Sequence, residues 1–238
     1  MILAAHWISA ESLFEHSPTG DGKTTVITKM KSARSTVNIP SVIGGYTVIG
    51  IGEGVFSEET EPPLTEVIIP AEVTSIGAEA FKDCDGVSIT IEGALDQVGE
   101  FAFYGCNGLK SVKFKDGMTS ISAYAFASTA LTQVILPKSV TLIDENAFDG
   151  CSSLLSVVMS AENTQVCNSA FNGTGVKILY LYGNDAQIAD FLENSVASKN
   201  ESILDTKIYV YSEARPTENT EYNGFWYLDG DGRTKIWK

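Results

Sequence analysis

Apolar side chains recur along this chain at fixed distances from a series of phenylalanines. Six segments of similar sequence each end in Phe, at successive intervals of 25, 22, 23, 22 and 23 residues. These residues are Phe56, Phe81, Phe103, Phe126, Phe148 and Phe171. A period in the twenties indicates one supersecondary unit per repeat, stacked on copies of itself, because a single unit cannot bury its own apolar face. The pattern therefore predicts a solenoid, and each coil is named here by its Phe.

Each repeat also contains a short alternation of apolar and polar residues. In the Phe81 coil, Val67 and Ile69 flank one residue, and the same two positions are apolar in the following repeats. Alternation with a period of two is typical of a strand with one buried face. Val73 and Ile76 mark a second extended segment, and Ala precedes the Phe in five of the repeats. Each coil is predicted to contain a strand, a turn, a short strand and a helical turn.

The segments on either side of the repeats are predicted to cap the solenoid, because its terminal coils would otherwise expose core and unpaired strand edges. On the N-terminal side, residues 24–29 and 35–39 are predicted strands, and "SVIGGYT" between the second strand and the first coil is a predicted loop. On the C-terminal side, residues 185–199 have apolar positions at helical spacing, with Asn184 or Asp185 as the N-cap.

The end of the chain is predicted to form an aromatic hairpin. A strand is expected at "KIYVYSEARP", and "GFWYLDGDGRTKIW" has two β-prone runs around an Asp-Gly turn. Its aromatic residues are predicted to form a lid over the final coil: Tyr222, Phe225, Trp226, Tyr227 and Trp237. The predicted boundaries are residues 1–36 for the N-terminal cap, 37–183 for the solenoid and 184–238 for the C-terminal cap.

The segment "EVIIPAEVTSIGAEAFKDCDGV" resembles the BspA-like leucine-rich repeat, a short class also found in treponemal surface proteins. The resemblance covers about residues 37–183 and implies a mainly β leucine-rich-repeat solenoid of six to seven coils with short helical turns. Departures from the repeat are Val55 for Ala, Thr129 and Thr174 for Cys, and Cys167 for Gly. The family's members are commonly secreted or displayed on bacterial surfaces and bind host or neighbouring-cell molecules. The resemblance brings no catalytic residues.

Charge and hydropathy narrow the possible partners. The 16 basic and 30 acidic residues give a formal net charge of −14, which repels nucleic acid and anionic lipid surfaces. No run approaches the roughly 18 apolar residues that suggest membrane insertion. The start, "MILAAHWISA", lacks the basic beginning and full apolar core of a secretory signal. A location at the cell surface or outside the cell is therefore implied by the resemblance alone.

The cysteines follow the repeat. Cys84, Cys106 and Cys151 each lie three residues after a repeat Phe, where Thr129 and Thr174 take the same place in other coils. This position accepts small, weakly polar side chains, so the thiols are predicted to be buried as small hydrophobic groups. The alternative is that stacked Cys84 and Cys106 come close enough to oxidise.

No catalytic, metal or cofactor site is predicted. The chain has two histidines, His6 and His16, both before the repeats and without partner residues placed by the repeat. The motif "TGDGKT" lacks the first glycine and the preceding buried strand of a phosphate loop, and "DGDGR" lacks the later Glu of a calcium loop. Both are predicted to be hairpin turns, and the protein is not predicted to be an enzyme.

The predicted binding surface lies on the outward side of the first strands. Parallel strands in register would align outward residues from coil to coil, about 5 Å apart, and toward the C-terminal half this line becomes apolar. The candidate site residues are Lys113, Gln133, Ile135, Val158, Ile178 and Tyr180. An exposed apolar patch with a polar rim is typical of a docking surface. The alternatives are that the helix at residues 185–199 covers it, or that β propensity alone accounts for it.

These patterns predict a non-catalytic, adhesin-like binding module that recognises a protein or carbohydrate at a host or bacterial cell surface. The alternative is a structural spacer or self-assembly module without a dedicated ligand, in which the apolar line and the solenoid ends mediate self-association. An enzyme site within the caps is a third hypothesis, and the sequence places no convergent set of groups there.

Overall fold

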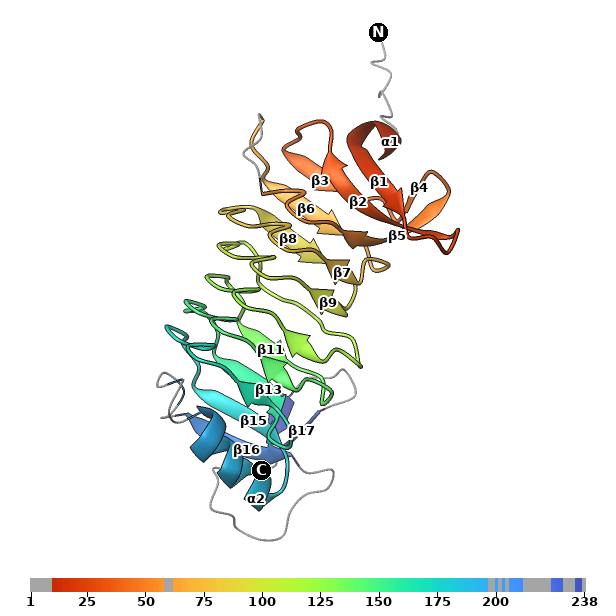
Figure 1. Cartoon of the computed structure of the whole chain (residues 1–238). Coiled ribbons are helices and arrows are strands. Elements are labelled where there is room, and N and C mark those ends of the chain that lie inside the picture. Colours follow the sequence, from red (N-terminus) through yellow and green to blue (C-terminus); the bar gives the residue numbers. More distant parts are fainter. Residues whose placement is uncertain are drawn as a thin grey trace.

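The computed structural model of the chain describes residues 10–57, 62–196, 200, 203, 206–211, 224–228 and 234–236. The described elements form an elongated stack of coils with one cap at each end (Figure 1). The elements are α1 (Ala10–Leu13), β1 (Phe14–Pro18), β2 (Thr24–Met30), β3 (Thr36–Asn38), β4 (Val42–Ile43), β5 (Tyr46–Ile51), β6 (Glu66–Ile69), β7 (Ser75–Ile76), β8 (Ser88–Ile91), β9 (Gln97–Val98), β10 (Ser120–Ile121), β11 (Gln133–Ile135), β12 (Leu142–Ile143), β13 (Ser156–Ser160), β14 (Gln165–Val166), β15 (Ile178–Tyr182), α2 (Asp185–Asp190), the π-helical turn η1 (Phe191–Val196), β16 (Lys207–Tyr211), β17 (Phe225–Leu228) and β18 (Thr234–Ile236).

One side of the stack, called the strand face below, consists of the first strands of the coils. Strands β3, β6 and β8 form one parallel sheet, and β11, β13, β15 and β16 continue as a second, which ends in β17 and β18. The predicted register is confirmed, because Ile68 pairs with Thr90 and Val158 pairs with Tyr180. Outward residues at equivalent positions therefore stand side by side.

The second extended segments form a narrower pair of sheets. Strands β5, β7 and β9 join the N-terminal hairpin in one sheet, and β10, β12 and β14 form another. Glycine holds these coils close together: a Cβ on Gly77 or Gly99 would meet backbone atoms of the preceding coil at 2.6 or 2.4 Å. In the next coil this position is occupied by Ser122 in place of glycine. The Ser122 hydroxyl donates to the Val98 carbonyl at 2.7 Å. The sheet divides at this change, between β9 and β10.

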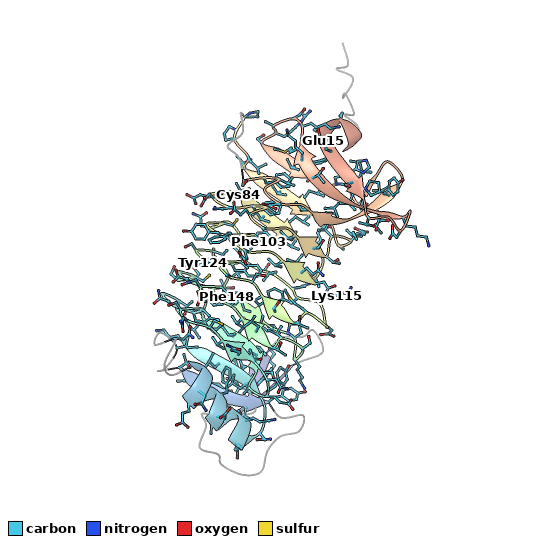
Figure 2. All side chains as sticks on the ribbon, in the orientation of Figure 1. Glu15, Cys84, Phe103, Lys115, Tyr124 and Phe148 are labelled. Carbon is cyan, nitrogen blue, oxygen red and sulfur yellow. The ribbon has the colours of Figure 1, made fainter. Side chains whose placement is uncertain are left out.

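The core is a column of stacked phenylalanine rings. Consecutive rings from Phe56 to Phe171 are nearly parallel, with centroids 4.8, 5.3, 5.5, 5.6 and 5.3 Å apart. Phe14 ends the column edge-on to Phe56, at 6.4 Å. Figure 2 shows Phe103 and Phe148 in the middle of the stack. Since each ring packs on the ring of the next coil, the repeat that is visible in the sequence is also the unit of packing.

The third side, called the helical-turn face, carries the tight turns around each Phe. Two residues before the Phe the backbone is left-handed in every coil, with φ between 54° and 63°, whether the residue is Gly, Glu, Phe, Tyr, Asn or Ser. This conformation points the peptide N–H at the next coil: Phe101 N donates to Ala123 O and Tyr124 N to Glu145 O, both at 3.1 Å. The turns thus form a ladder along the stack.

The N-terminal cap is a hairpin joined to the first coil. The turn between β1 and β2 is the predicted one at "TGDGKT", where the Asp21 carboxylate accepts bonds from the Lys23 and Thr24 N–H groups, each at 2.8 Å. These hydrogen bonds lower the pKa of Asp21 to about 2. The prediction of a loop at "SVIGGYT" was wrong, because β4 and β5 pair as a hairpin there. Gly44 and Gly45, both with positive φ, make its two-residue turn.

The C-terminal cap begins with the predicted helix. Asn184 is its N-cap: the Asn184 side chain accepts from Gln187 N at 3.0 Å, and the Gln187 side chain accepts from Asn184 N at 2.8 Å. Ile188 and Phe191 are buried against the last coil. Strand β16 then extends the strand face, and β17 and β18 form the predicted terminal hairpin. Its Asp-Gly turn lies outside the described residues, as does His6 at the other end.

The Phe126 coil departs from the predicted pattern, since residues 111–114 form no strand in the described structure. Phe114 instead makes an isolated bridge with Leu95 of the preceding coil. The equivalent positions in the flanking coils hold Ile91 and Leu136, and the larger Phe114 ring packs edge-on against Phe126 at 5.7 Å. The expected continuous strand face is therefore interrupted, between β8 and β11.

Candidate functional site

The predicted apolar line on the strand face is formed as expected but is not exposed. Val158 is 0% and Tyr180 6% accessible, and both pack against Trp226 of β17. The Trp226 ring lies 5.3 Å from that of Tyr180, and its Nε1–H donates to the Leu181 carbonyl at 3.4 Å. The prediction that Val158 and Tyr180 face solvent was wrong, because the terminal hairpin returns over these strands.

The other candidate residues lie at the margin of this cover. Ile135 and Ile178 are half-buried and pack against the same cluster, and the Gln133 side chain donates to the Thr234 hydroxyl of β18 at 3.2 Å. Of the six candidates, Lys113 alone is classed as exposed, and it lies in the interrupted coil. The cover is the hairpin, whereas the proposed alternative was the helix at residues 185–199.

A cleft opens on the strand face where this cover ends. It has a volume of about 410 Å³ and lies between the interrupted Phe126 coil and the Phe148 coil, with Tyr182 at one side. Its lining residues are Phe114, Asp116, Gly117, Ile135, Leu136, Pro137, Lys138, Ser139 and Tyr182. One of the predicted site residues, Ile135, thus lines an open site. The missing strand at residues 111–114 makes the room, and neither the interruption nor the cleft was predicted.

A lysine and two tyrosines meet beside this cleft. Lys138 Nζ lies 4.3 Å from the centroid of the Tyr182 ring and 5.1 Å from that of Tyr211. Burial, with smaller contributions from Tyr211 and Asp116, raises the pKa of Tyr182 to about 12. The phenol is therefore protonated at neutral pH. The cleft offers an aromatic surface, one cation, one carboxylate and one serine hydroxyl, which suits a ligand with both an apolar face and polar edges.

A second, more polar cleft of about 400 Å³ lies on the other side of the same coil. It opens at the division between β9 and β10 and is lined by Ile76, Asp96, Gln97, Val98, Gly99, Gly117, Met118, Thr119, Ser120 and Ser122. Gly117 belongs to both clefts. The irregular Phe126 coil therefore borders both openings.

The cysteines of the repeat are structural donors. The thiols of Cys84, Cys106 and Cys151 each donate to the carbonyl of the preceding coil's Phe, at 3.3, 2.9 and 3.0 Å. A hydrogen bond with Cys84 and burial raise the pKa of the Cys106 thiol. Cys84, Cys106 and Cys151 are buried thiols, as predicted, and no disulfide joins Cys84 to Cys106. Thr129 fills the same position by donating to its own coil's Phe126 carbonyl, at 2.9 Å.

The remaining candidate groups have structural partners. His16 Nδ1 lies 2.9 Å from the Thr25 hydroxyl within the N-terminal hairpin. Within the described ranges, no group of three His, Cys, Asp or Glu side chains is placed to hold a metal ion. Over the same ranges, no helix combines the length and the hydropathy that crossing a membrane requires.

Comparison with known proteins identifies the repeat. The sequence profile of the BspA type leucine rich repeat region matches residues 28–87 and 74–192, in six copies. No curated protein matches the chain.

Three solved structures show the same fold. A leucine rich cell surface protein from Faecalibacterium prausnitzii is 23% identical, with a TM-score of 0.60 over 95% of this chain and 59% of that one. The T. pallidum leucine rich repeat protein is 22% identical, with a TM-score of 0.57 over 79% of this chain and 95% of that one. A leucine-rich repeat protein from Bacteroides ovatus is 18% identical, with a TM-score of 0.51 over 83% of this chain and 69% of that one.

These likenesses confirm the predicted fold class, a mainly β leucine-rich-repeat solenoid of about seven turns. The chain spans about three-fifths of the length of the Faecalibacterium protein, 59%.

Proposed function

Because the chain belongs to the BspA-type leucine-rich repeat family, we propose that it is a non-catalytic binding module that takes a protein or glycan ligand in the cleft on its strand face. The observation that carries this proposal is the position of the cleft, at the point where the hairpin's cover ends and the strand face is interrupted. A solenoid presents a long surface, and an open cleft with aromatic and charged walls is where such a surface can grip a ligand.

The proposed site differs from the one expected from the sequence. Val158 and Tyr180 do not line it, because they lie beneath Trp226, whose ring also contacts that of Tyr182. Ile135 and Lys113 remain at or beside the opening, since Ile135 lines the cleft and Lys113 is exposed in the coil that borders it. The ligand contacts are assigned to Phe114, Lys138 and Tyr182.

The adhesin-like role and the location at the cell surface are proposed from similarity to known proteins. The Faecalibacterium neighbour is described as a cell surface protein, and a binding module of this shape at a bacterial surface would meet host or neighbouring-cell molecules. Self-association, the alternative role, was predicted to use the apolar line and the solenoid ends. The hairpin covers Val158 and Tyr180 of that line, so the ends are the surfaces that this alternative retains.

The test is a binding screen of the purified chain against extracellular-matrix proteins, a glycan array and bacterial cells. The variant Lys138→Glu reverses the charge of the cation over Tyr182, and Lys29→Glu is the matched control, since Lys29 is an exposed lysine on β2 in the N-terminal cap, away from the cleft. We expect a ligand that Lys138→Glu loses and Lys29→Glu keeps. Equal binding by the parent and Lys138→Glu would contradict the site. No ligand, together with a mass that grows with concentration in light scattering, would favour assembly.

A further inference from the structure

Three aromatic side chains gather on the helical-turn face, away from the cleft. Phe101 and Tyr124 come from adjacent coils and stack with centroids 4.6 Å apart and planes within 6°. Tyr104 meets both at steep angles, at 5.8 Å from Phe101 and 6.4 Å from Tyr124. All three are only half-buried, and Figure 2 shows Tyr124 at the outer edge formed by the turns. Phe101, Tyr104 and Tyr124 are called the turn aromatic cluster.

The solenoid itself does not need aromatic residues at these places. Phe101 and Tyr124 occupy the left-handed position of the turn, each at φ 55°, a conformation that bulky L residues disfavour. Other coils build the same turn with Gly54 or Asn146, which suit this conformation better. Two aromatic residues in adjacent coils, half-buried at the surface and against the backbone's preference, distinguish this part of the helical-turn face from the other coils.

Acidic residues occupy neighbouring positions of the same turns. Glu79 precedes Phe101 at the same position of the turn, one coil earlier, and exposed Glu100 is its neighbour in sequence. Exposed Glu145 belongs to the coil after Tyr124, and its backbone carbonyl accepts the Tyr124 N–H. The whole chain carries a net charge of −14, so a cationic partner is also attracted at longer range.

The chain already contains one example of the contact that this surface can make. Lys82 Nζ lies 5.3 Å from the Phe101 ring centroid and 3.3 Å from the Glu79 carboxylate. One cation is thus held by an aromatic ring and a carboxylate together. Tyr104 and Tyr124 are further half-buried rings of this face, and Glu100 and Glu145 are exposed acidic residues of the same turns.

We infer that the turn aromatic cluster, with Glu100 and Glu145, is a docking site for an arginine-rich segment of a partner protein. A guanidinium group stacks on aromatic rings and pairs with carboxylates through its planar fork of donors, which a lysine ammonium cannot do equally well. The exposed carboxyl-bearing residues Glu100 and Glu145 and the net charge of −14 favour this cationic partner over a neutral glycan. This site is separate from the cleft on the strand face.

The experiment measures binding of an oligo-arginine peptide by calorimetry, with an oligolysine peptide of equal length in parallel. The main variant is Phe101→Asn/Tyr124→Asn, because Asn already serves this turn at Asn146 and keeps the fold. Ser169→Asn, at the same position of a coil outside the cluster, is the matched control. We expect the double variant to lose about tenfold in affinity for oligo-arginine, and the control to lose none.

A second variant guards against a folding defect in the first. Glu100→Gln/Glu145→Gln changes two exposed side chains and should lower the affinity several-fold without moving the unfolding midpoint. Unchanged affinity in both double variants would overturn the proposal, since binding would then follow net charge alone. Equal losses in Ser169→Asn, or oligolysine binding as tightly as oligo-arginine, would overturn it too. So would capture of a neutral oligosaccharide by the cluster in place of oligo-arginine.

Discussion

The two halves of the strand face, on either side of the interrupted Phe126 coil, have the same backbone register but opposite surroundings. In the N-terminal half the outward line contains Ile68 and Thr90, which reach the surface, whereas in the C-terminal half Val158 and Tyr180 lie beneath Trp226. A single outward apolar residue such as Ile68 therefore needs no cover, whereas the apolar line over several consecutive coils is covered by a second layer of protein. A ligand site is better sought at the edge of that layer, where cover stops and a cleft begins.

The largest effect is expected from removing the core that both halves share. Phe126 stacks between Phe103 and Phe148 and also packs against Phe114 of the interrupted segment. Phe126→Ala should lower the free energy of unfolding by about 3 to 5 kcal/mol, because the neighbouring coils cannot collapse into the space. Urea unfolding measures this. Phe101→Ala, which removes a half-buried ring at the surface, is the control. An equal loss of unfolding free energy in this control would contradict the role of the Phe column as the main source of stability.

Removing the cover should convert the C-terminal half into a surface like the N-terminal one. Trp226→Ala leaves the Val158 and Tyr180 cluster without its central ring and should cost about 3 kcal/mol. The loss should be accompanied by new binding of a hydrophobic dye and faster amide exchange confined to β13, β15 and β16. Faster exchange in β6 and β8 as well would show that the two halves are not separable.

A smaller loss of stability is expected from changing the N-cap of helix α2, which follows the last coil. Asn184→Ala removes one side of the capping box with Gln187, so we expect a loss of about 1 kcal/mol in the free energy of unfolding. Thermal unfolding of Asn184→Ala beside Asn184→Asp measures it, since Asp retains the accepting oxygen. Equal losses in the two variants would show that the cap contributes nothing.

The smallest effect is a dependence on alkaline pH beside the cleft. The pKa of Tyr182 is raised to about 12 from 10 by burial, so the folded state holds this proton more tightly than the unfolded chain does. The favourable contribution of the neutral phenol is therefore complete below pH 10 and is lost as the pH rises through about 12. Tyrosinate absorbance should show one late-titrating phenol that Tyr182→Phe removes. An unchanged titration curve in that variant would assign the late step to another tyrosine.

Much of the fold could be predicted because its causes are local or periodic. The Phe column, the alternation at Val67 and Ile69, and the cap at Asn184 each follow from residue type and spacing, and all three appear as expected. The hairpin at β4 and β5 was missed although Gly44 and Gly45 are a common two-residue turn, because the extra length before the first coil suggested a loop.

The candidate site was predicted in part. Ile135 and Lys113 remain at or near an opening, while Val158 and Tyr180 are covered. The residue that covers them, Trp226, was predicted to form part of a lid over the final coil, and the prediction did not connect that lid with the apolar line on the strand face. Both the apolar line and the aromatic residues near the end of the chain need a buried surface to pack on. That shared need could have suggested the contact between Trp226 and Tyr180. The missing strand at residues 111–114 borders the cleft, and there Phe114 packs edge-on against Phe126. Aligning the repeats by their apolar positions does not indicate this packing.

The sequence by itself determined the repeat, its stacking, the inward Phe of each coil and the helix cap at Asn184, because a recurring period of 22 or 23 residues buries the same face in every copy. Only the tertiary structure decided which outward residues meet solvent. Burial of an outward side chain depends on whether a segment distant in the chain returns over it, and no spacing within the repeat records that return.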